Sequence, residues 1–288
     1  MFVGLWGQAM HQRLSRNLLL TATATALSML AAGTAQAQFV SANEIERETR
    51  VQWLTMKRDI PKPADPRIQP FVECVAWSII EVLEEPYSEM NWEVVVFDDE
   101  AINAFAMVGG QIGVFTGIFK VADTVDSLAA VIGHEIAHVT ENHVMARARR
   151  ERGGDVLEIL AGAVGEQIGR GIYDPYYGNY GRYGSSVGRE AGRTLASFGL
   201  LLPFSRGQES DADLKGLEYM AKAGYDPRAS IELWKNMSAS REGDQPAEFA
   251  STHPADDRRI YDLVSSMTPA LITYNEGLEE RGRAICTP

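Results

Sequence analysis

Residues 134–138 have the sequence His-Glu-Ile-Ala-His, which constrains the fold more than any other part of the chain. On an α-helix, residues four apart lie on the same face, one turn from each other. The imidazole rings of His134 and His138 can then both reach one metal ion at ~2.0–2.1 Å. Glu135 lies about 100° further around the helix, where its carboxylate can take a proton from a metal-bound water. The segment therefore predicts a helix that carries a hydrolytic zinc site.

A motif with only three fixed residue types also occurs by chance. The interpretation as a metal site therefore requires that the flanking residues favour a helix as well. Residues 126–152 contain no proline, and their apolar residues recur at helical spacing. Asp126 and Ser127 are good N-terminal caps, and the arginines between 147 and 152 suit a helix C-terminus. We therefore predict one helix over 126–152 and favour metal binding over the alternative, in which both histidines are ordinary core residues.

A catalytic zinc site takes three protein ligands and a water, so a third ligand is needed. His143 follows His134 by nine residues, about half a turn around the predicted helix. We therefore expect it to point away from the metal and to have a structural role. Neither cysteine lies near a suitable helix, so cysteine is excluded as the third ligand.

Glu209 and Asp213 are the best candidates to complete the site. They are four residues apart in a later predicted helix, which places both carboxylates on one face. Glu209 gives the two-histidine, one-glutamate set of a catalytic zinc site. Asp213 could accept the free N–H of a ligand histidine and fix its tautomer, or donate a proton during turnover. The alternative for both is a solvated acidic face.

Periodicity predicts a mainly helical α+β fold, with strands only between residues 92 and 116. We expect a strand at 92–97 and a hairpin of strands 103–108 and 112–116 joined at Gly109-Gly110, which together form a small antiparallel or mixed sheet. Helices are expected at about 41–56, 70–85, 126–152, 155–168, 206–223 and 227–240, with a last one after Pro254.

The first 37 residues have the composition of a signal peptide. Arg13 and Arg16 precede an apolar stretch over 18–32, and Ala35-Gln36-Ala37 forms a small-residue cleavage site. We therefore expect cleavage after Ala37 and an exported domain over 38–288, with an uncleaved amphipathic anchor as the alternative. No later apolar stretch reaches the ~18 residues of a spanning helix, so we expect no stable membrane span after cleavage.

Charge and cysteine content narrow the partners and the compartment. The formal net charge of −12 makes nucleic acid a poor partner. In an oxidising compartment Cys74 and Cys286 could form a disulfide or remain free, and their sequence positions leave this open. The oligomeric state is also open. Residues 169–192 are dense in glycine and tyrosine, which is compatible either with a flap that grips a peptide or with a surface loop.

The motifs together resemble those of the HtpX-like gluzincin peptidases, a family that also holds the CAAX prenyl proteases and BepA-like periplasmic peptidases. The resemblance covers about residues 70–265 and includes 134–138, Glu209 with Ala212-Asp213, 224–227, the strand region 103–117, and Ser-Thr-His-Pro at 251–254 followed by Arg258 and Arg259. It implies a gluzincin fold with His134, His138 and Glu209 as ligands of one zinc, and Glu135 as general base. The chain departs from HtpX and the prenyl proteases in lacking transmembrane helices, and from BepA-like members in lacking a repeat domain.

His253 lies in the last of these motifs and has two functional interpretations. It could stabilise the oxyanion of the tetrahedral intermediate, or become a fourth zinc ligand that keeps the enzyme latent. The alternative is a loop histidine that stabilises its own turn.

The resemblance implies a zinc endopeptidase of the periplasm, or of another exported compartment, that acts on misfolded or misassembled envelope polypeptides. The outer-membrane assembly machinery is a candidate partner. One alternative is a latent or inactive peptidase-fold chaperone. Another is an enzyme that is confined to a membrane-anchored substrate because the N-terminal segment persists.

Overall fold

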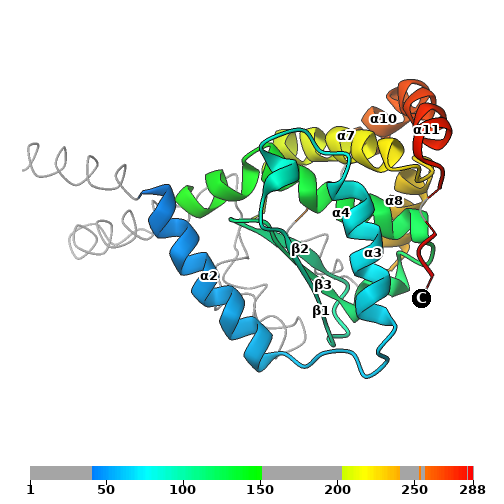
Figure 1. Cartoon of the computed structure of the whole chain (residues 1–288). Helices are drawn as coiled ribbons and strands as arrows, with labels where there is room; N and C mark the ends of the chain where they lie inside the picture. Colours follow the sequence, from blue (N-terminus) through cyan, green and yellow to red (C-terminus); the bar gives the residue numbers. More distant parts are fainter. Residues whose placement is uncertain (1–40, 151–202, 241–252, 254–256, 284, 288) are drawn as a thin grey trace, which may run out of the picture. The chain divides into compact units, whose positions relative to one another are not determined.

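A small mixed sheet separates the first helix from the helix that carries the His-Glu-Ile-Ala-His segment (Figure 1). The computed structural model describes residues 41–150, 203–240, 253, 257–283 and 285–287. Strand order is β1-β3-β2, with β1 (Glu93–Phe97) parallel to β3 (Gln111–Phe115) and β2 (Ala104–Met107) antiparallel to β3. Gly109 and Gly110 form the hairpin turn at φ 98° and 84°, values that glycine adopts without steric cost.

The two faces of the sheet follow the alternation of side chains along its strands. On one face, Val95, Phe97, Phe105, Met107 and Phe115 pack with Trp53 and Met56 of α2 (Ala42–Asp59). Residues at the intervening positions face α3 (Ile68–Ile80), which packs on β1, and α4 (Val125–Thr140), which packs on β2. The sheet is therefore covered by helices on both sides.

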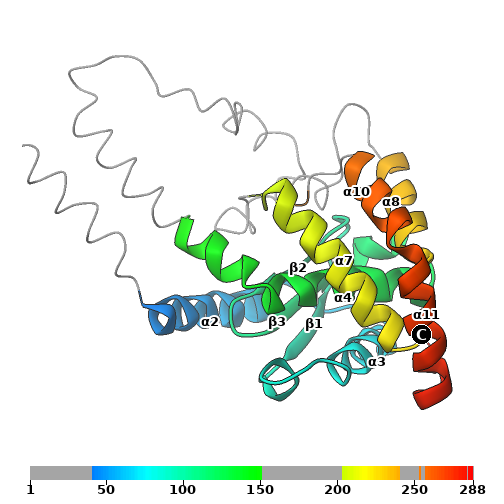
Figure 2. The ribbon, with the colours of Figure 1, turned by 90° about the horizontal axis from the view of Figure 1, so that it is seen from above.

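Helix α4 is the centre of the fold. Thr124 caps it through a reciprocal pair of hydrogen bonds with Ser127, and every residue from Ser127 to Thr140 is buried. A helix that is buried all round must be enclosed by other elements. Here these are the sheet, α3, α7 (Arg206–Lys222) and α8 (Ala229–Ala239). Figure 2 shows α7 lying over α4.

The remaining described elements are short connections or lie near the C-terminus. Helices α10 (Asp257–Ser265) and α11 (Met267–Arg281) both pack on α7, and α10 also contacts α8. None of the described helices is long and apolar enough to cross a membrane. The two short connections are the 3-10 helices η1 (Tyr87–Glu89) and η2 (Thr116–Lys120).

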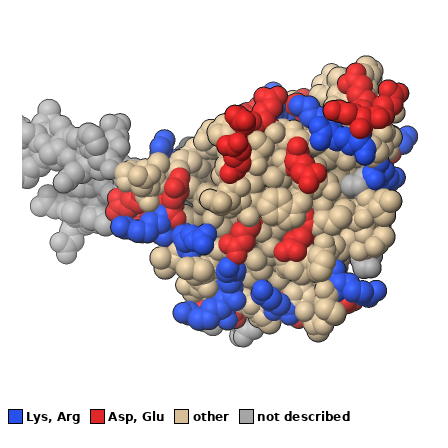
Figure 3. Space-filling view, in the orientation of Figure 1, with Lys and Arg blue, Asp and Glu red and all other residues tan. Residues whose placement is uncertain are grey.

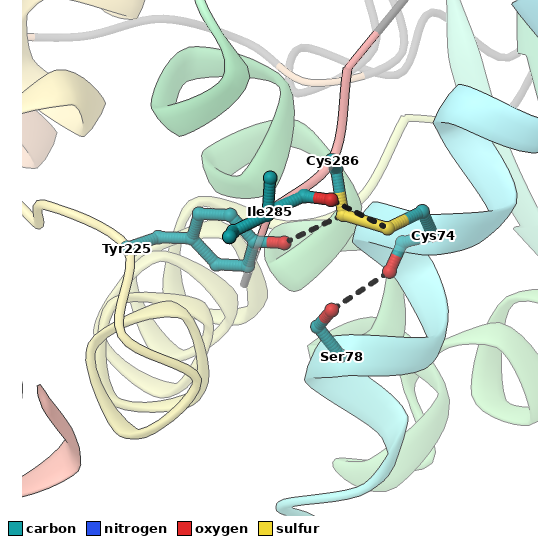
Figure 4. The surroundings of a disulfide bond; sticks show 5 residues. All are labelled: Cys74, Ser78, Tyr225, Ile285 and Cys286. Atoms are coloured by element: carbon teal, nitrogen blue, oxygen red, sulfur yellow. Dashed lines mark hydrogen bonds between the residues drawn. A yellow bond between two sulfur atoms is a disulfide. The ribbon is translucent and has the colours of Figure 1, made fainter. Parts of the chain in front are cut away.

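A disulfide between Cys74 and Cys286 joins the C-terminal segment to α3 (Figure 4). The Tyr225 hydroxyl lies 3.6 Å from the Cys286 sulfur. Three residues earlier, Arg283 donates to Asp126 at the start of α4 over 2.6 Å. The structure therefore resolves the pairing that the sequence left open, and the C-terminal segment contacts two helices of the core.

The predicted fold class is confirmed, because the protein is mainly helical with a small mixed sheet before the metal-motif helix. The helix predicted over 126–152 is wrong in its bounds, since α4 ends at Thr140 and residues 143–150 begin a separate helical segment. One helix was predicted after Pro254, whereas the structure has two. The signal peptide over 1–37, the helix at 155–168 and the loop at 169–192 lie outside the described residues.

Candidate metal centre

Helix α4 brings His134 and His138 together as the four-residue spacing predicts. Their Nε2 atoms lie 3.0 Å apart, and both side chains are buried. Two imidazole nitrogens this close need a bridging proton or a shared cation, because two lone pairs repel each other.

Glu209 approaches the same point from α7, whose first turn is fixed by a capping box between Ser205 and Gln208. Its Oε1 lies 3.4 Å from His138 Nε2, and its Oε2 lies 3.6 Å from His134 Nε2. A tetrahedral ion with ligands at 2.0–2.1 Å has ligand atoms about 3.3 Å apart. The three side chains therefore have the spacing that a zinc ion requires.

The close approach of α4 and α7 depends on two glycines. A Cβ atom added to Gly133 would lie 2.9 Å from the Gly216 carbonyl oxygen, and one added to Gly216 would lie 2.8 Å from the His134 backbone nitrogen. Side chains at these positions would hold the helices further apart. The glycine pair thus sets how near Glu209 comes to the two histidines.

His253 contributes a fourth nitrogen to the cluster. Its Nδ1 lies 3.1 Å from His134 Nε2 and 3.1 Å from Glu209 Oε1. The ligand atoms of His134, His138, Glu209 and His253 all lie within 4.8 Å of one another, and all four residues are buried. In this arrangement His253 would add a fourth donor atom to an ion held by the other three residues, where a catalytic zinc site binds water. Its Nε2 lies 3.4 Å from Glu135 Oε1.

Asp213 lies behind the first histidine, since its Oδ1 is 3.0 Å from His134 Nδ1. Because a carboxylate accepts hydrogen bonds, this contact keeps the proton of a neutral His134 on Nδ1 and directs the Nε2 lone pair into the cluster. Burial alone would raise the pKa of Asp213, but the charge of Arg259 and the hydrogen bond from His134 outweigh burial and lower it. Asp213 is therefore placed for the first of its two predicted roles.

Arg259 is buried between the two acidic residues of α7. It donates through Nε and Nη2 to Asp213 over 2.6 and 2.8 Å, and its Nη1 lies 2.6 Å from Glu209 Oε2. Its guanidinium carbon lies 3.9 Å from the centre of a Trp234 ring. Burial would raise the pKa of Glu209, but the charges of His253 and Arg259 outweigh burial, and the pKa lies well below its ordinary value.

His143 is not among the four clustered residues, in line with its predicted structural role, but it contacts one of them, which the prediction missed. Its Nδ1 lies 3.1 Å from His138 Nδ1, so one of these two nitrogens donates to the other. The prediction assumed an unbroken helix, whereas the chain turns at Asn142, whose φ is 59°. A proton donated by His138 to His143 would leave the His138 Nε2 lone pair facing the cluster.

Glu135 lies beside the cluster with a relative exposure of 1%. Burial raises its pKa to about 7, although the charge of His134 works in the opposite direction. Among the described residues, its carboxylate lies 3.4 Å from His253 Nε2 and is in contact with the backbone of Ala106. A carboxylate of this kind is suited to accept and return a proton near neutral pH.

Two site residues were missed at the sequence level, namely His143 as a contact of His138 and Arg259 as the partner of Glu209 and Asp213. Asn142 carried a signal for the first, because asparagine often ends a helix in the left-handed conformation. Arg259 was noted as part of the family resemblance, but its sequence position gave no sign of these two partners, because an arginine near a helix start is usually solvated.

Comparison with known proteins agrees with this geometry. Residues 65–266 match Peptidase family M48. The chain belongs to this family. Mitochondrial metalloendopeptidase OMA1 of Schizosaccharomyces pombe is 36% identical over 175 residues, which are 60% of this chain and 46% of that protein. The Beta-barrel assembly-enhancing protease of Yersinia pestis is 28% identical over 208 residues, which are 72% of this chain and 40% of that protein. This M48 chain thus spans less than half the length of these two relatives.

Proposed function

We propose that the protein is a zinc endopeptidase in which His134, His138 and Glu209 hold one zinc ion and Glu135 is the general base. The observation that carries this proposal is that the Nε2 atoms of His134 and His138 and the two carboxylate oxygens of Glu209 lie 3.0 to 3.6 Å from one another across the three side chains, inside a buried cluster. Membership of Peptidase family M48 supports it. A buried set of two histidines and one glutamate also has the donor chemistry that zinc prefers.

When bound, zinc would supply Lewis-acid polarisation of the scissile carbonyl and would lower the pKa of a water molecule. Glu135 takes the proton of that water and passes it to the leaving amine. Asp213 holds His134 in the tautomer that presents Nε2, rather than donating a proton itself. Its ion pair with Arg259 supports this choice, because the pair keeps Asp213 ionised.

We propose that His253 holds the site in a resting form, in preference to the role in oxyanion stabilisation. Its Nδ1 lies among the ligand atoms, and its Nε2 is 3.4 Å from Glu135. In this position His253 would compete with water for a bound metal, and its Nε2 faces the proposed general base. His253 must move before a substrate can react.

The substrates of this site are polypeptides, and an extended segment would bind along β2 by strand addition. Strand β2 is at the edge of the described sheet, and the backbone of Ala106 contributes to the pKa of Glu135. Its four residues are each at most 4% exposed, so this binding mode requires movement at that edge. Acidic and basic side chains are interspersed on the face drawn in Figure 3.

We further propose that the protein is exported after cleavage following Ala37 and degrades misfolded or misassembled envelope proteins. The disulfide supports export, because such bonds persist in oxidising compartments. We propose the outer-membrane assembly machinery as a partner, and the name of the Yersinia pestis relative, Beta-barrel assembly-enhancing protease, is compatible with a setting of β-barrel assembly. The relatives named mitochondrial are a reason to determine the compartment directly.

Removing and restoring the metal tests the zinc proposal. We expect a chelator to abolish casein cleavage, one equivalent of zinc to restore it, and Glu209→Gln to lower the zinc content. Cleavage that survives complete metal removal would contradict the mechanism.

If a strain that carries only the inactive Glu135→Gln protein grows like wild type, the chaperone alternative is favoured.

A further inference from the structure

Arg259 bridges the two carboxylates of α7 and is neither a proposed metal ligand nor a proposed proton donor or acceptor. We propose that Arg259 is a positioning residue that orients Glu209 and Asp213, and through them His134, for metal binding. This inference rests on the proposed zinc site and adds a determinant outside the ligand set.

The contacts of Arg259 use its three nitrogens separately. Nε and Nη2 form a two-point pair with Asp213 at 2.6 and 2.8 Å, while Nη1 lies 2.6 Å from Glu209 Oε2. The ion pair with Oε2 leaves Oε1 facing His138 and His253, at 3.4 and 3.1 Å. Arg259 thereby fixes the orientation of the Glu209 carboxylate, whose Oε2 also lies 3.6 Å from His134 Nε2.

The same guanidinium is held in one orientation by its surroundings. It lies 3.9 Å from the centre of a Trp234 ring, and Nη1 also donates to the His253 carbonyl over 3.4 Å. Helix α10, which carries Arg259, packs on both α7 and α8. A planar, ring-stacked group of this kind holds two carboxylates in a fixed relation.

Charge makes the contact necessary. Glu135, Glu209 and Asp213 are each at most 6% exposed, so three acidic side chains are buried close to one another. A buried carboxylate without a partner bears the full cost of desolvation. If Arg259 were lost, the carboxylates of Glu209 and Asp213 would turn toward other donors or take up protons. Both outcomes remove the arrangement that binds a metal.

Lysine cannot replace this arginine. An ammonium group is a compact charge and cannot make a two-point contact with one carboxylate while also reaching the second. Arg259→Lys therefore keeps the charge and removes the orientation, which separates the two contributions. The neighbouring Arg258, whose side chain is 78% exposed and 3.6 Å from Asp262, provides the matched control Arg258→Lys.

The experiment measures zinc affinity by competition with a chelator of known affinity, using the wild-type protein and both variants. We expect Arg259→Lys to bind zinc about 10- to 100-fold more weakly, as is typical when a residue that supports a metal ligand is lost. Arg258→Lys should match the wild type. The visible absorption spectrum of the cobalt-substituted protein reports ligand geometry, and we expect it to change only in Arg259→Lys. In the zinc enzyme, kcat should fall while KM changes little.

Wild-type zinc affinity and an unchanged cobalt spectrum in Arg259→Lys would overturn the inference. A purely structural role would lower the melting temperature of the metal-free and zinc-loaded forms equally, whereas a positioning role reduces the rise that zinc produces. If Arg259→Lys does not fold, Arg259→Gln is compared on the same measurements and judged by the same result. A wild-type protein that binds no zinc would refute the proposed function itself, so the two failures are distinguishable.

Discussion

Replacing Gly216 by alanine should separate α4 from α7 and weaken the metal site without touching any ligand. The added Cβ would lie 2.8 Å from the backbone carbon of Gly133, whereas ordinary contact begins at 3.4 Å. The obstructing atoms belong to a helix backbone, so they cannot rotate away. The two helices must therefore move apart by roughly 0.6 Å.

This displacement is large compared with what a metal site tolerates. Ligand distances in metal sites fall within about ±0.2 Å of their ideal values, and Gly133 directly precedes His134. Overpacking costs about 1–3 kcal/mol, while alanine gains about 0.5–1 kcal/mol over glycine within a helix. We therefore expect Gly216→Ala to lower the free energy of unfolding by up to about 2.5 kcal/mol, and to weaken zinc binding by at least about tenfold.

Urea unfolding and chelator competition measure the two effects. Gly207→Ala is the matched control, because Gly207 lies in the same helix and a Cβ there would meet nothing within 4 Å. This control should be slightly more stable than the wild type and should bind zinc normally. If Gly216→Ala behaves like Gly207→Ala in both assays, the helix separation does not determine the site.

Three further predictions concern other parts of the structure. His253→Ala should raise the cleavage rate of a short unstructured peptide, tenfold for each ~1.4 kcal/mol by which the resting form is favoured. A lower cleavage rate would instead favour a role of His253 in oxyanion stabilisation. Because the disulfide spans 212 residues, loss of both Cys74 and Cys286 by serine substitution should cost about 2–5 kcal/mol, and an unchanged melting temperature would contradict this. Burial works to raise the pKa of Glu93, but hydrogen bonds from Lys57 and Trp53 outweigh burial and lower the pKa below its ordinary 4.5. Glu93→Gln should therefore lower the free energy of unfolding by up to about 1 kcal/mol at pH 7. This difference is lost as the pH falls through the lowered folded pKa of Glu93, and urea unfolding at several pH values measures it.

The sequence predicted the parts of the site that depend on local spacing. His134 and His138, and likewise Glu209 and Asp213, are four residues apart, so one helical turn is enough to place each pair on one face. The structure brings the two pairs together. The strands were also predicted, because β-branched and aromatic residues alternate with turn residues over 92–116.

The parts that were missed depend on contacts between distant segments or on a single turn. Arg259 meets Glu209 and Asp213 from another helix, and no sequence period encodes that contact. Gly133 and Gly216 lie in ordinary helical segments, and only the crossing of α4 and α7 shows why neither carries a side chain. The contact of His143 with His138 was missed because the backbone turn at Asn142 ends α4 and changes the direction of the chain.

The central claim is that Glu135 performs the proton transfer at a metal held by other residues. Cleavage rate and zinc content measured on the same sample of Glu135→Gln test this claim most directly. We predict one zinc per chain, as in the wild type, and casein cleavage reduced by about 10²–10⁴-fold, the usual contribution of a general base. Full cleavage activity in this variant, with zinc retained, would contradict the mechanism.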